Sequence, residues 1–243
     1  MEFMDCPCVL EAGGKPVSMS EIRERLESVR DRIRCACTKA GRSPDSVRLI
    51  AVTKNHPAST LQELINLGVR DLGENRVQEI EQKVPLLDGD FTMHMIGHLQ
   101  TNKVQKVLPL VGWVQSVDRE KLVQRIEALH SGPKLKVLLE VNTSGELSKS
   151  GCAPEECEAL CERVKSSPAL DLRGLMTIGP LYGDEKSVRG AFSQLRSLSV
   201  KCCSCLEKPE LSMGMSGDFE WAIEEGSTMV RIGTLLVGER VRK

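Results

Sequence analysis

The sequence predicts an α/β protein that folds as a single (β/α)8 barrel of the TIM type. Short apolar runs alternate with amphipathic segments about eight times, as in a parallel sheet covered by helices. The 243 residues suit one closed barrel, for which roughly 250 residues are typical. No Gly-x-Gly-x-x-Gly turn follows the first apolar run, and this absence disfavours the runner-up, an open Rossmann-like sheet.

The elements are predicted from spacing and from glycine and proline breaks. The first helix is expected from Ser20, because apolar residues follow it at helical spacing until Gly41 and Pro44 end the pattern. Strands are expected at 47–53, 69–72, 91–96, 113–116, 135–141, 170–178, 210–212 and 229–232. Helices are expected between them at 57–67, 76–84, 101–108, 119–129, 154–166, 184–200 and 218–225. Residues 1–18 lack periodicity, so we expect a flexible extension there and one barrel domain over 19–243.

The composition disfavours several classes of partner. Lysine plus arginine number 33 and aspartate plus glutamate 34, so the net charge of -1 indicates neither nucleic acid nor an anionic membrane as a partner. No apolar stretch is long enough to span a bilayer, and the first residues do not resemble a signal peptide. We therefore expect a cytoplasmic protein.

The cysteines and histidines do not predict a metal site. Of ten cysteines, the densest groups are Cys6-Pro7-Cys8 and Cys202-Cys203-Ser204-Cys205, and no histidine lies near either in the sequence. Cys35, Cys157 and Cys161 fall within helical patterns as small core or surface residues, so we interpret the thiols as structural or incidental. His94 and His98 lie where a strand runs into a loop, so their side chains need not converge.

Polar residues and glycines gather where the predicted strands end, which is the active face of such barrels. Lys54 ends the first apolar run. It is either an ordinary lysine that reaches solvent or, if desolvated, a lysine able to form a Schiff base.

The loops after strands seven and eight are where barrels often bind phosphate. They contain the hydroxyls of Ser212, Ser216 and Thr234 and the glycines Gly214, Gly217 and Gly233. Glycine lets the backbone approach an anion, but tight turns also need glycine. Arg231 is either a salt-bridge residue or a partner for a pyridine nitrogen that it keeps unprotonated.

Several motifs together resemble the pyridoxal phosphate homeostasis (YggS/PROSC) family over about Ser20 to Gly238. They are Ala51-Val52-Thr53-Lys54, Gly73-Glu74-Asn75, His94 to Lys103, Lys149-Ser150-Gly151, Arg173 to Met176, Leu211 to Ser216 and Ser227 to Thr234. The chain departs from the family at Met93, where an aromatic residue is usual, and in residues 1–18 and its extra cysteines. None of these departures touches Lys54 or the predicted phosphate loops.

The resemblance implies a fold like the N-terminal domain of alanine racemase, without that enzyme's second domain. It implies that Lys54 carries pyridoxal 5′-phosphate (PLP) as a Schiff base. The cofactor, mainly its phosphate, is expected to be surrounded by Ser212, Gly214, Arg231, Gly233 and Thr234. Within this set Arg231 is expected nearer the ring nitrogen, and Asn75 and Met176 are expected to line the pocket.

The family implies a monomeric PLP carrier in PLP and amino-acid homeostasis, with PLP-requiring apo-enzymes as possible recipients and no catalytic residues. The alternative is a PLP-dependent amino-acid racemase, which needs two bases on opposite faces of the substrate. Tyr182 is the one tyrosine and lies outside these motifs, so the carrier is favoured. A third reading is a phosphate-binding barrel that uses Lys54 without PLP.

Overall fold

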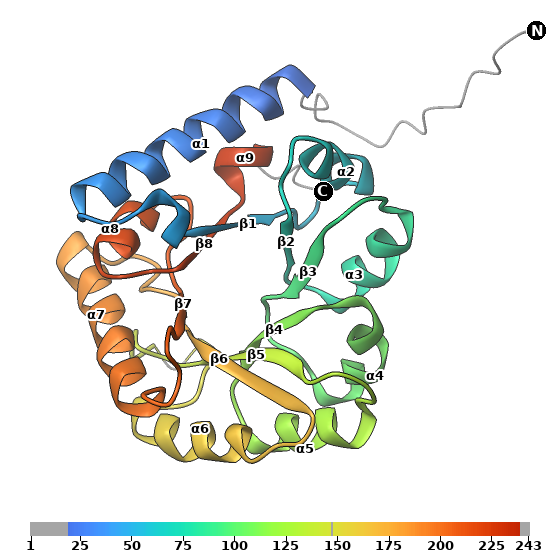
Figure 1. The fold of residues 1–243 in the computed structure, drawn as a ribbon, viewed down its shortest axis with the longest axis vertical. Helices are drawn as coiled ribbons and strands as arrows, with labels where there is room; N and C mark the ends of the chain where they lie inside the picture. Colours follow the sequence, from blue (N-terminus) through green and yellow to red (C-terminus); the bar gives the residue numbers. More distant parts are fainter. Residues whose placement is uncertain (1–18, 147, 239–243) are drawn as a thin grey trace, which may run out of the picture.

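The chain folds into a closed barrel of eight parallel strands surrounded by helices, as a computed structural model of residues 19–146 and 148–238 shows. The strands pair in sequence order, and β8 pairs with β1 to close the ring. Figure 1 shows the helices forming an outer layer around the strands. The predicted fold class is therefore confirmed. The extension predicted at 1–18 lies outside the described residues.

The strands are β1 (Arg48–Val52), β2 (Asp71–Glu74), β3 (Thr92–Met95), β4 (Trp113–Val117), β5 (Leu135–Glu140), β6 (Leu170–Met176), β7 (Glu210–Ser212) and β8 (Met229–Ile232). The helices are α1 (Met19–Lys39), α2 (Ala58–Asn66), α3 (Val77–Lys83), α4 (Val104–Val107), α5 (Glu120–Leu129), α6 (Cys157–Lys165), α7 (Glu185–Cys202), α8 (Phe219–Glu224) and α9 (Thr234–Val237). The predicted helix 101–108 is shorter than expected, because 3-10 turns flank α4 on both sides. The predicted strand 170–178 ends at Met176.

The prediction of the second strand at 69–72 was wrong by two residues. Val69 is buried like a strand residue, but its N–H donates to the carbonyl of Leu64 and so closes the end of α2. The β2 ladder begins at Asp71, which pairs with Ile50. Gly73 and Glu74 therefore belong to the strand itself, and Asn75 is the first residue beyond it.

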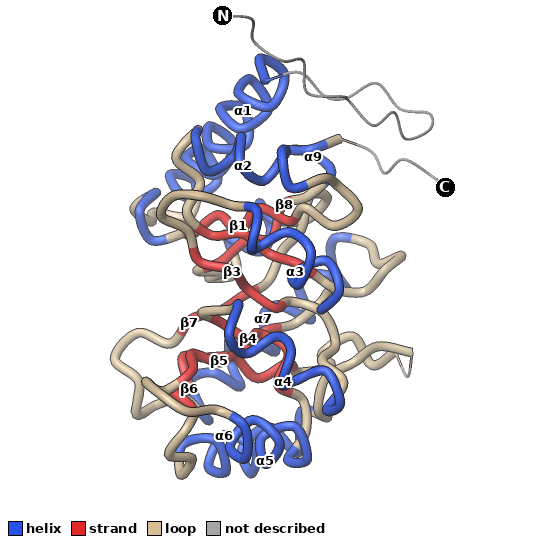
Figure 2. Tube along the Cα trace, turned by 90° about the vertical axis from the view of Figure 1, so that its right-hand side faces the viewer, coloured by secondary structure: helices blue, strands red, loops and turns tan. Residues whose placement is uncertain are grey.

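Helix α1 covers the part of the barrel that the last unit leaves open. Helix α9 has four residues, which is too short to cover β8 and β1 alone. The apolar face of α1, including Leu26 and Val29, is buried, and Figure 1 shows α1 lying across α8 and α9. Arg32 of α1 holds both carboxylate oxygens of Glu220 at 2.8 and 3.0 Å. The side view in Figure 2 shows α1 and α9 together at the end of the molecule beyond β1 and β8.

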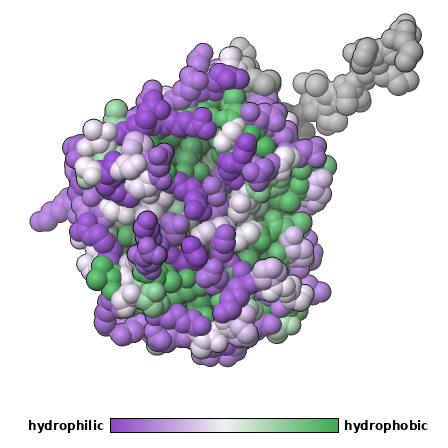
Figure 3. Space-filling view, viewed as in Figure 1, coloured by the Kyte–Doolittle hydropathy of each residue, from purple (hydrophilic) through white to green (hydrophobic). Residues whose placement is uncertain are grey.

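The barrel has two apolar regions, because alternate strand residues face the helices and the interior. The larger lies between strands and helices. The smaller, inside the ring, consists of Ile50, Trp113, Leu138, Met176 and Met229. The outer surface in the view of Figure 3 is mainly hydrophilic. Among the described residues, no helix combines the length and apolar character needed to cross a membrane.

Candidate functional site

The predicted site residues all lie at or just beyond the carboxyl ends of five strands that are consecutive around the barrel. In the order β6, β7, β8, β1 and β2, they are Met176, Ser212, Gly214, Arg231, Gly233, Thr234, Lys54 and Asn75. Parallel strands place these ends on one face of the barrel. The fold therefore brings the eight residues to one rim, as expected from their positions.

The turn that carries Lys54 is fixed by a helix outside the barrel. Lys83 of α3 donates from Nζ to the carbonyl of Thr53 at 3.0 Å, and Glu79 accepts the N–H of Asn55 at 2.7 Å. The turn closes with a hydrogen bond from the His56 N–H to the same Thr53 carbonyl at 3.1 Å. Both neighbours of Lys54 are thus held, while Lys54 itself is half-buried.

A buried ion pair supports this turn. Lys83 Nζ lies 2.7 Å from Glu74 Oε1 and 2.7 Å from Glu79 Oε2, and the hydroxyl of Thr53 also donates to Glu74 Oε1 at 2.7 Å. Burial raises the pKa of Glu74, although Lys83 opposes the change. Burial also acts to raise the pKa of Glu79, but the bonds from Lys83 and Asn55 outweigh it, and that pKa is lowered.

Arg231 is a cation buried inside the barrel. Its guanidinium donates to the hydroxyl of Ser212 at 2.7 Å and to the carbonyl of Thr177 at 2.8 Å. Burial lowers the pKa of Arg231 to about 10, while Asp218 and Glu140 act to raise it. The side chain therefore stays charged at neutral pH.

A chain of hydrogen bonds runs from Ser212 across the barrel. The Ser212 hydroxyl donates to Gln115 Oε1 at 2.7 Å, and Gln115 Nε2 lies 2.9 Å from His94 Nδ1. His94 Nε2 lies 2.9 Å from Asp71 Oδ1, and its ring stacks on Trp113 with centroids 5.5 Å apart. In this arrangement the hydroxyl of Ser212 holds Arg231. The contact predicted between Ser212 and a phosphate stays a prediction.

Two glycines of the predicted phosphate loops occupy positions where a side chain would not fit or would crowd the backbone. Gly214 has φ +93°, and a Cβ there would lie 2.5 Å from the Cβ of Ala222. A Cβ on Gly233 would lie 3.3 Å from the carbonyl oxygen of Val52. Gly233 therefore packs against the strand that leads to Lys54, and the Gly233 N–H donates to the Ser216 hydroxyl at 3.3 Å.

Some buried polar atoms at the strand ends make no hydrogen bond with any other described residue. They include Asn75 Oδ1 and Glu140 Oε2. Burial raises the pKa of Glu140 to about 7, with a further contribution from Asp118 and an opposing one from Arg231. Leaving such atoms unpaired is costly, so they are expected to meet a polar ligand or water.

His94 and His98 do not converge, as expected. His94 points into the interior network, whereas His98 is exposed, with Nδ1 3.3 Å from Asp118 Oδ2. Sequence reasoning missed Lys83, which holds the carbonyl of Thr53 next to Lys54, and Gln115, which accepts from the Ser212 hydroxyl that holds Arg231. The signal for Lys83 was its spacing of four from Glu79 on the predicted helix, which also describes ordinary surface pairs.

Comparisons with known proteins agree with this fold. The family described as "Alanine racemase, N-terminal domain" matches residues 25–241. A crystal structure of alanine racemase from E. faecalis has a TM-score of 0.66 at 17% identity, covering 85% of this chain and 56% of that one, which shows a common fold. The class of protein is thus an alanine-racemase-type barrel.

Closer relatives narrow the class. A pyridoxal phosphate homeostasis protein of Pseudomonas aeruginosa is 47% identical over 91% of this chain and 97% of its own length. The structure of PipY from Synechococcus elongatus with PLP bound has a TM-score of 0.79 at 36% identity, covering 89% of this chain and 100% of that one. This chain belongs to the pyridoxal phosphate homeostasis protein family.

Proposed function

We propose that this protein binds PLP as a Schiff base on Lys54 and acts in PLP and amino-acid homeostasis. One observation carries the proposal: the turn at Lys54 is held from both sides by the buried Lys83 and its partner Glu79. Burying the charges of Lys83 and Glu74 costs free energy, and the result is a lysine fixed at the rim where the glycine loops and Arg231 also lie. The name of the relatives and the PLP bound to PipY give independent support.

The residues at the rim fit the chemistry of PLP. Its aldehyde requires a lysine amine, its phosphate requires backbone N–H groups and hydroxyls, and its pyridine nitrogen requires a polar partner. Lys54, the Gly233-Thr234 loop beside it and the buried Arg231 offer these groups. The unpaired Asn75 Oδ1 offers a further polar contact to a ligand. Met176 lies inside the barrel, where it would pack against the ring.

Carriage of PLP is favoured over catalysis. When bound, PLP supplies an electron sink, which is strongest if its ring nitrogen is protonated. Arg231 stays charged at neutral pH, and a cation beside that nitrogen would keep it unprotonated. Racemisation also needs a second base, and the one tyrosine, Tyr182, is 96% exposed on the loop after β6.

Absorption spectroscopy of the purified protein with PLP tests the binding proposal. We expect wild type to develop a visible band that borohydride converts into a stable adduct, located on Lys54 by peptide mass spectrometry. Lys54→Ala should lose both the band and the adduct. Lys186→Ala is the matched control, because Lys186 is exposed on α7 and should bind PLP like wild type. A band of wild-type strength in Lys54→Ala would exclude Lys54 as the anchor.

The absence of enzymatic turnover is tested separately. We expect no D-enantiomer above background when the PLP-loaded protein is incubated with L-amino acids and analysed by chiral chromatography. Turnover in wild type that disappears in Lys54→Ala would instead support the racemase alternative.

As a carrier, the protein should act as a cytoplasmic monomer that delivers PLP to apo-enzymes. The eight described cysteines are free, which suits a reducing compartment. Light scattering during gel filtration tests whether the protein is a monomer.

Delivery is tested by activating a PLP-requiring apo-enzyme with PLP-loaded protein in the presence of a scavenger for free PLP. Activation no faster than the scavenger-limited background would argue for storage alone.

A further inference from the structure

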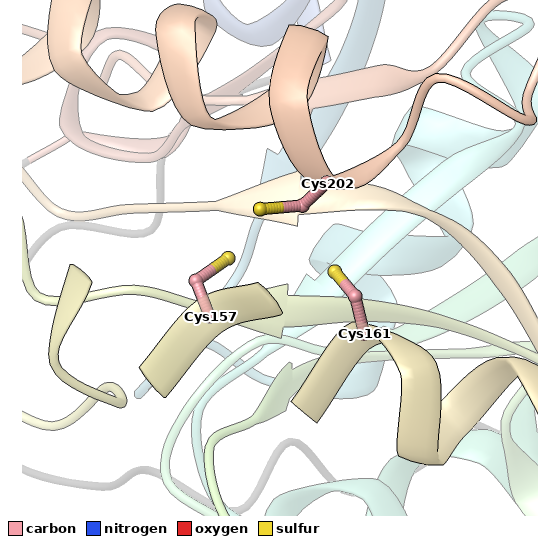
Figure 4. Close-up of side chains that lie close together, drawn as sticks. All are labelled: Cys157, Cys161 and Cys202. Atoms are coloured by element: carbon pink, nitrogen blue, oxygen red, sulfur yellow. The ribbon is translucent and has the colours of Figure 1, made fainter. Parts of the chain in front are cut away.

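A cluster of buried thiols lies outside the barrel, between two helices. Cys157 and Cys161 are four residues apart on α6, and Cys202 is the last residue of α7. Their three sulfur atoms all lie within 4.8 Å of one another, and all three residues are buried. Figure 4 shows the side chains of the two helices pointing toward one another across the gap between them.

Two further cysteines extend the cluster. The Cys152 thiol interacts with that of Cys157, and the Cys203 thiol with that of Cys161. Hydrogen bonds from the surrounding thiols lower the pKa of Cys157. Cys152 and Cys203 are themselves 4% and 0% exposed, so five sulfur atoms share one interior region.

The backbone around the cluster is fixed. Cys152 donates its N–H to the carbonyl of Glu140 at 2.9 Å, which ties it to the end of β5. Lys165 at the end of α6 donates to the carbonyl of Cys202 at 2.9 Å, which joins the ends of the two helices. The N–H of Cys203 completes the last turn of α7 by donating to Ser199. The sulfur atoms thus converge from segments held independently by strand and helices.

We propose that Cys157, Cys161 and Cys202 bind one thiophilic metal ion such as Zn²⁺, with Cys152 or Cys203 completing the site. Thiolate sulfur selects soft or borderline cations, and four such ligands form the usual structural zinc site. A zinc–sulfur bond of about 2.3 Å places tetrahedral sulfur atoms about 3.8 Å apart. Because the sulfur atoms lie within 4.8 Å of one another, the cluster needs to contract by at most roughly 1 Å. Each thiol that binds releases its proton to solvent.

This site was not expected from the sequence, which led us to predict no metal. In the sequence, Cys202-Cys203-Ser204-Cys205 stands by itself, with no histidine nearby to complete a set of ligands. The fold supplies the missing ligands from α6 and from the end of the loop after β5. Three separate segments thus contribute, and no short motif can reveal such a site.

Titration of the reduced, PLP-free protein with Cd²⁺ tests the proposal, because thiolate-to-cadmium charge transfer absorbs in the ultraviolet. All proteins should carry Cys6→Ser and Cys8→Ser, so that thiols outside the described residues cannot contribute. We expect one equivalent of Cd²⁺ to bind, to displace Zn²⁺ loaded beforehand, and to be retained on gel filtration as measured by elemental analysis. The affinity should fall at least tenfold in Cys161→Ser and in Cys202→Ser.

Cys37→Ser is the matched control. Cys37 is fully buried on α1, away from the cluster, so its substitution carries a similar burial cost without removing a ligand. It should bind Cd²⁺ like the parent. Zn²⁺ should also raise the thermal midpoint of the parent and of Cys37→Ser, because a ligand of the native state stabilises it. Absence of stoichiometric Cd²⁺ binding by the parent, or equal binding by folded Cys161→Ser and Cys202→Ser, would refute the site.

Discussion

The two basic residues of the site are held in different ways. At Lys54, charged groups of an outer helix bind the backbone of the turn: Lys83 binds Thr53 and Glu79 binds Asn55. At Arg231, a hydrogen-bonded network inside the barrel binds the side chain itself through Ser212. The first arrangement fixes the path of the backbone, and the second fixes the position of the guanidinium charge.

The difference suits the roles proposed for the two residues. A lysine that must form and break a covalent bond needs a fixed base and a side chain with some freedom. A cation that sets the electronic state of a ring needs a fixed head group. Ion pairs from α3 can serve the first purpose because they act on backbone atoms. Only partners within the barrel, such as Ser212 and Thr177, can serve the second.

Breaking the ion pair beneath Lys54 should have the largest effect. Lys83→Met leaves Glu74, which is fully buried, without its cation. Removing one partner of a buried pair typically costs about 3–5 kcal/mol. Urea unfolding should show this loss, and PLP capture at Lys54 should weaken in the folded fraction.

The double variant Lys83→Met/Glu74→Gln separates charge from packing. It removes the uncompensated charge, so it should recover much of the stability while leaving the Thr53 carbonyl without its lysine. Relative to Lys83→Met, the free energy of unfolding should therefore recover more completely than PLP capture at Lys54. Full recovery of both would mean that the pair does not position the turn.

The free energy of unfolding should depend on pH through Glu140, which lies near Arg231. Its pKa is raised from 4.5 to about 7, so between these pH values the folded state binds more protons than the unfolded state. The stabilising contribution of the protonated group is complete below pH 4.5 and is lost as pH rises through 7. From pH 5 to 8, PLP-free wild type should lose at most about 3 kcal/mol relative to Glu140→Gln.

Urea unfolding of both proteins at several pH values measures this difference. Glu155→Gln serves as the control for the loss of a carboxylate, because Glu155 is exposed. A Glu140→Gln profile parallel to that of wild type would show that Glu140 titrates alike in the folded and unfolded states.

The chain of hydrogen bonds from Ser212 through Gln115 to His94, called here the relay, can be tested by comparing substitutions of Gln115 and of its neighbour on β4, Ser116. Gln115→Ala removes the partner of both Ser212 and His94, and leaving buried polar groups unpaired costs about 1–3 kcal/mol. Ser116→Ala is the matched control, because the Ser116 hydroxyl is buried without a hydrogen-bond partner among the described residues. Its removal should be neutral or stabilising.

The spectrum of bound PLP supplies a second measurement on these variants. Gln115→Ala should alter the visible band if the relay holds Arg231 near the ring, whereas Ser116→Ala should leave it unchanged. Equal spectra and equal stabilities of the two variants would show that the relay has no special role.

The strand-end residues could be predicted from the sequence because their roles depend on position along the chain. Apolar runs locate the strands, and the first polar residues after them, such as Lys54, fall on the rim of any parallel barrel. Even the error of two residues at β2 left Asn75 beyond the strand, on the same face.

The supporting residues could not be predicted in this way, because their roles depend on which helix packs where. Lys83 looks like a surface residue in the sequence and is buried only because the Thr53 carbonyl and Glu74 lie beneath it. Gln115 lies in a strand whose residues are all buried, and its sequence gives no sign of a partner across the barrel. Cys161 and Cys202 meet only because α6 and α7 are neighbours in the outer layer.

The smallest effect is expected at the turn itself. Asn55 has φ +64°, a left-handed conformation that costs a non-glycine residue about 1 kcal/mol. Asn55→Ala should therefore destabilise the protein by at most about that amount, because asparagine tolerates this conformation better than alanine, while Asn55→Gly should be neutral or slightly stabilising.

Both substitutions keep the Asn55 N–H and hence its bond to Glu79. If α3 positions Lys54 by holding the backbone, PLP capture should remain at the wild-type level in Asn55→Gly and change little in Asn55→Ala. PLP capture is measured by borohydride trapping at equal protein stability. A large loss of capture in Asn55→Gly would show that the asparagine side chain positions Lys54, and not the hydrogen bond from the Asn55 N–H to Glu79.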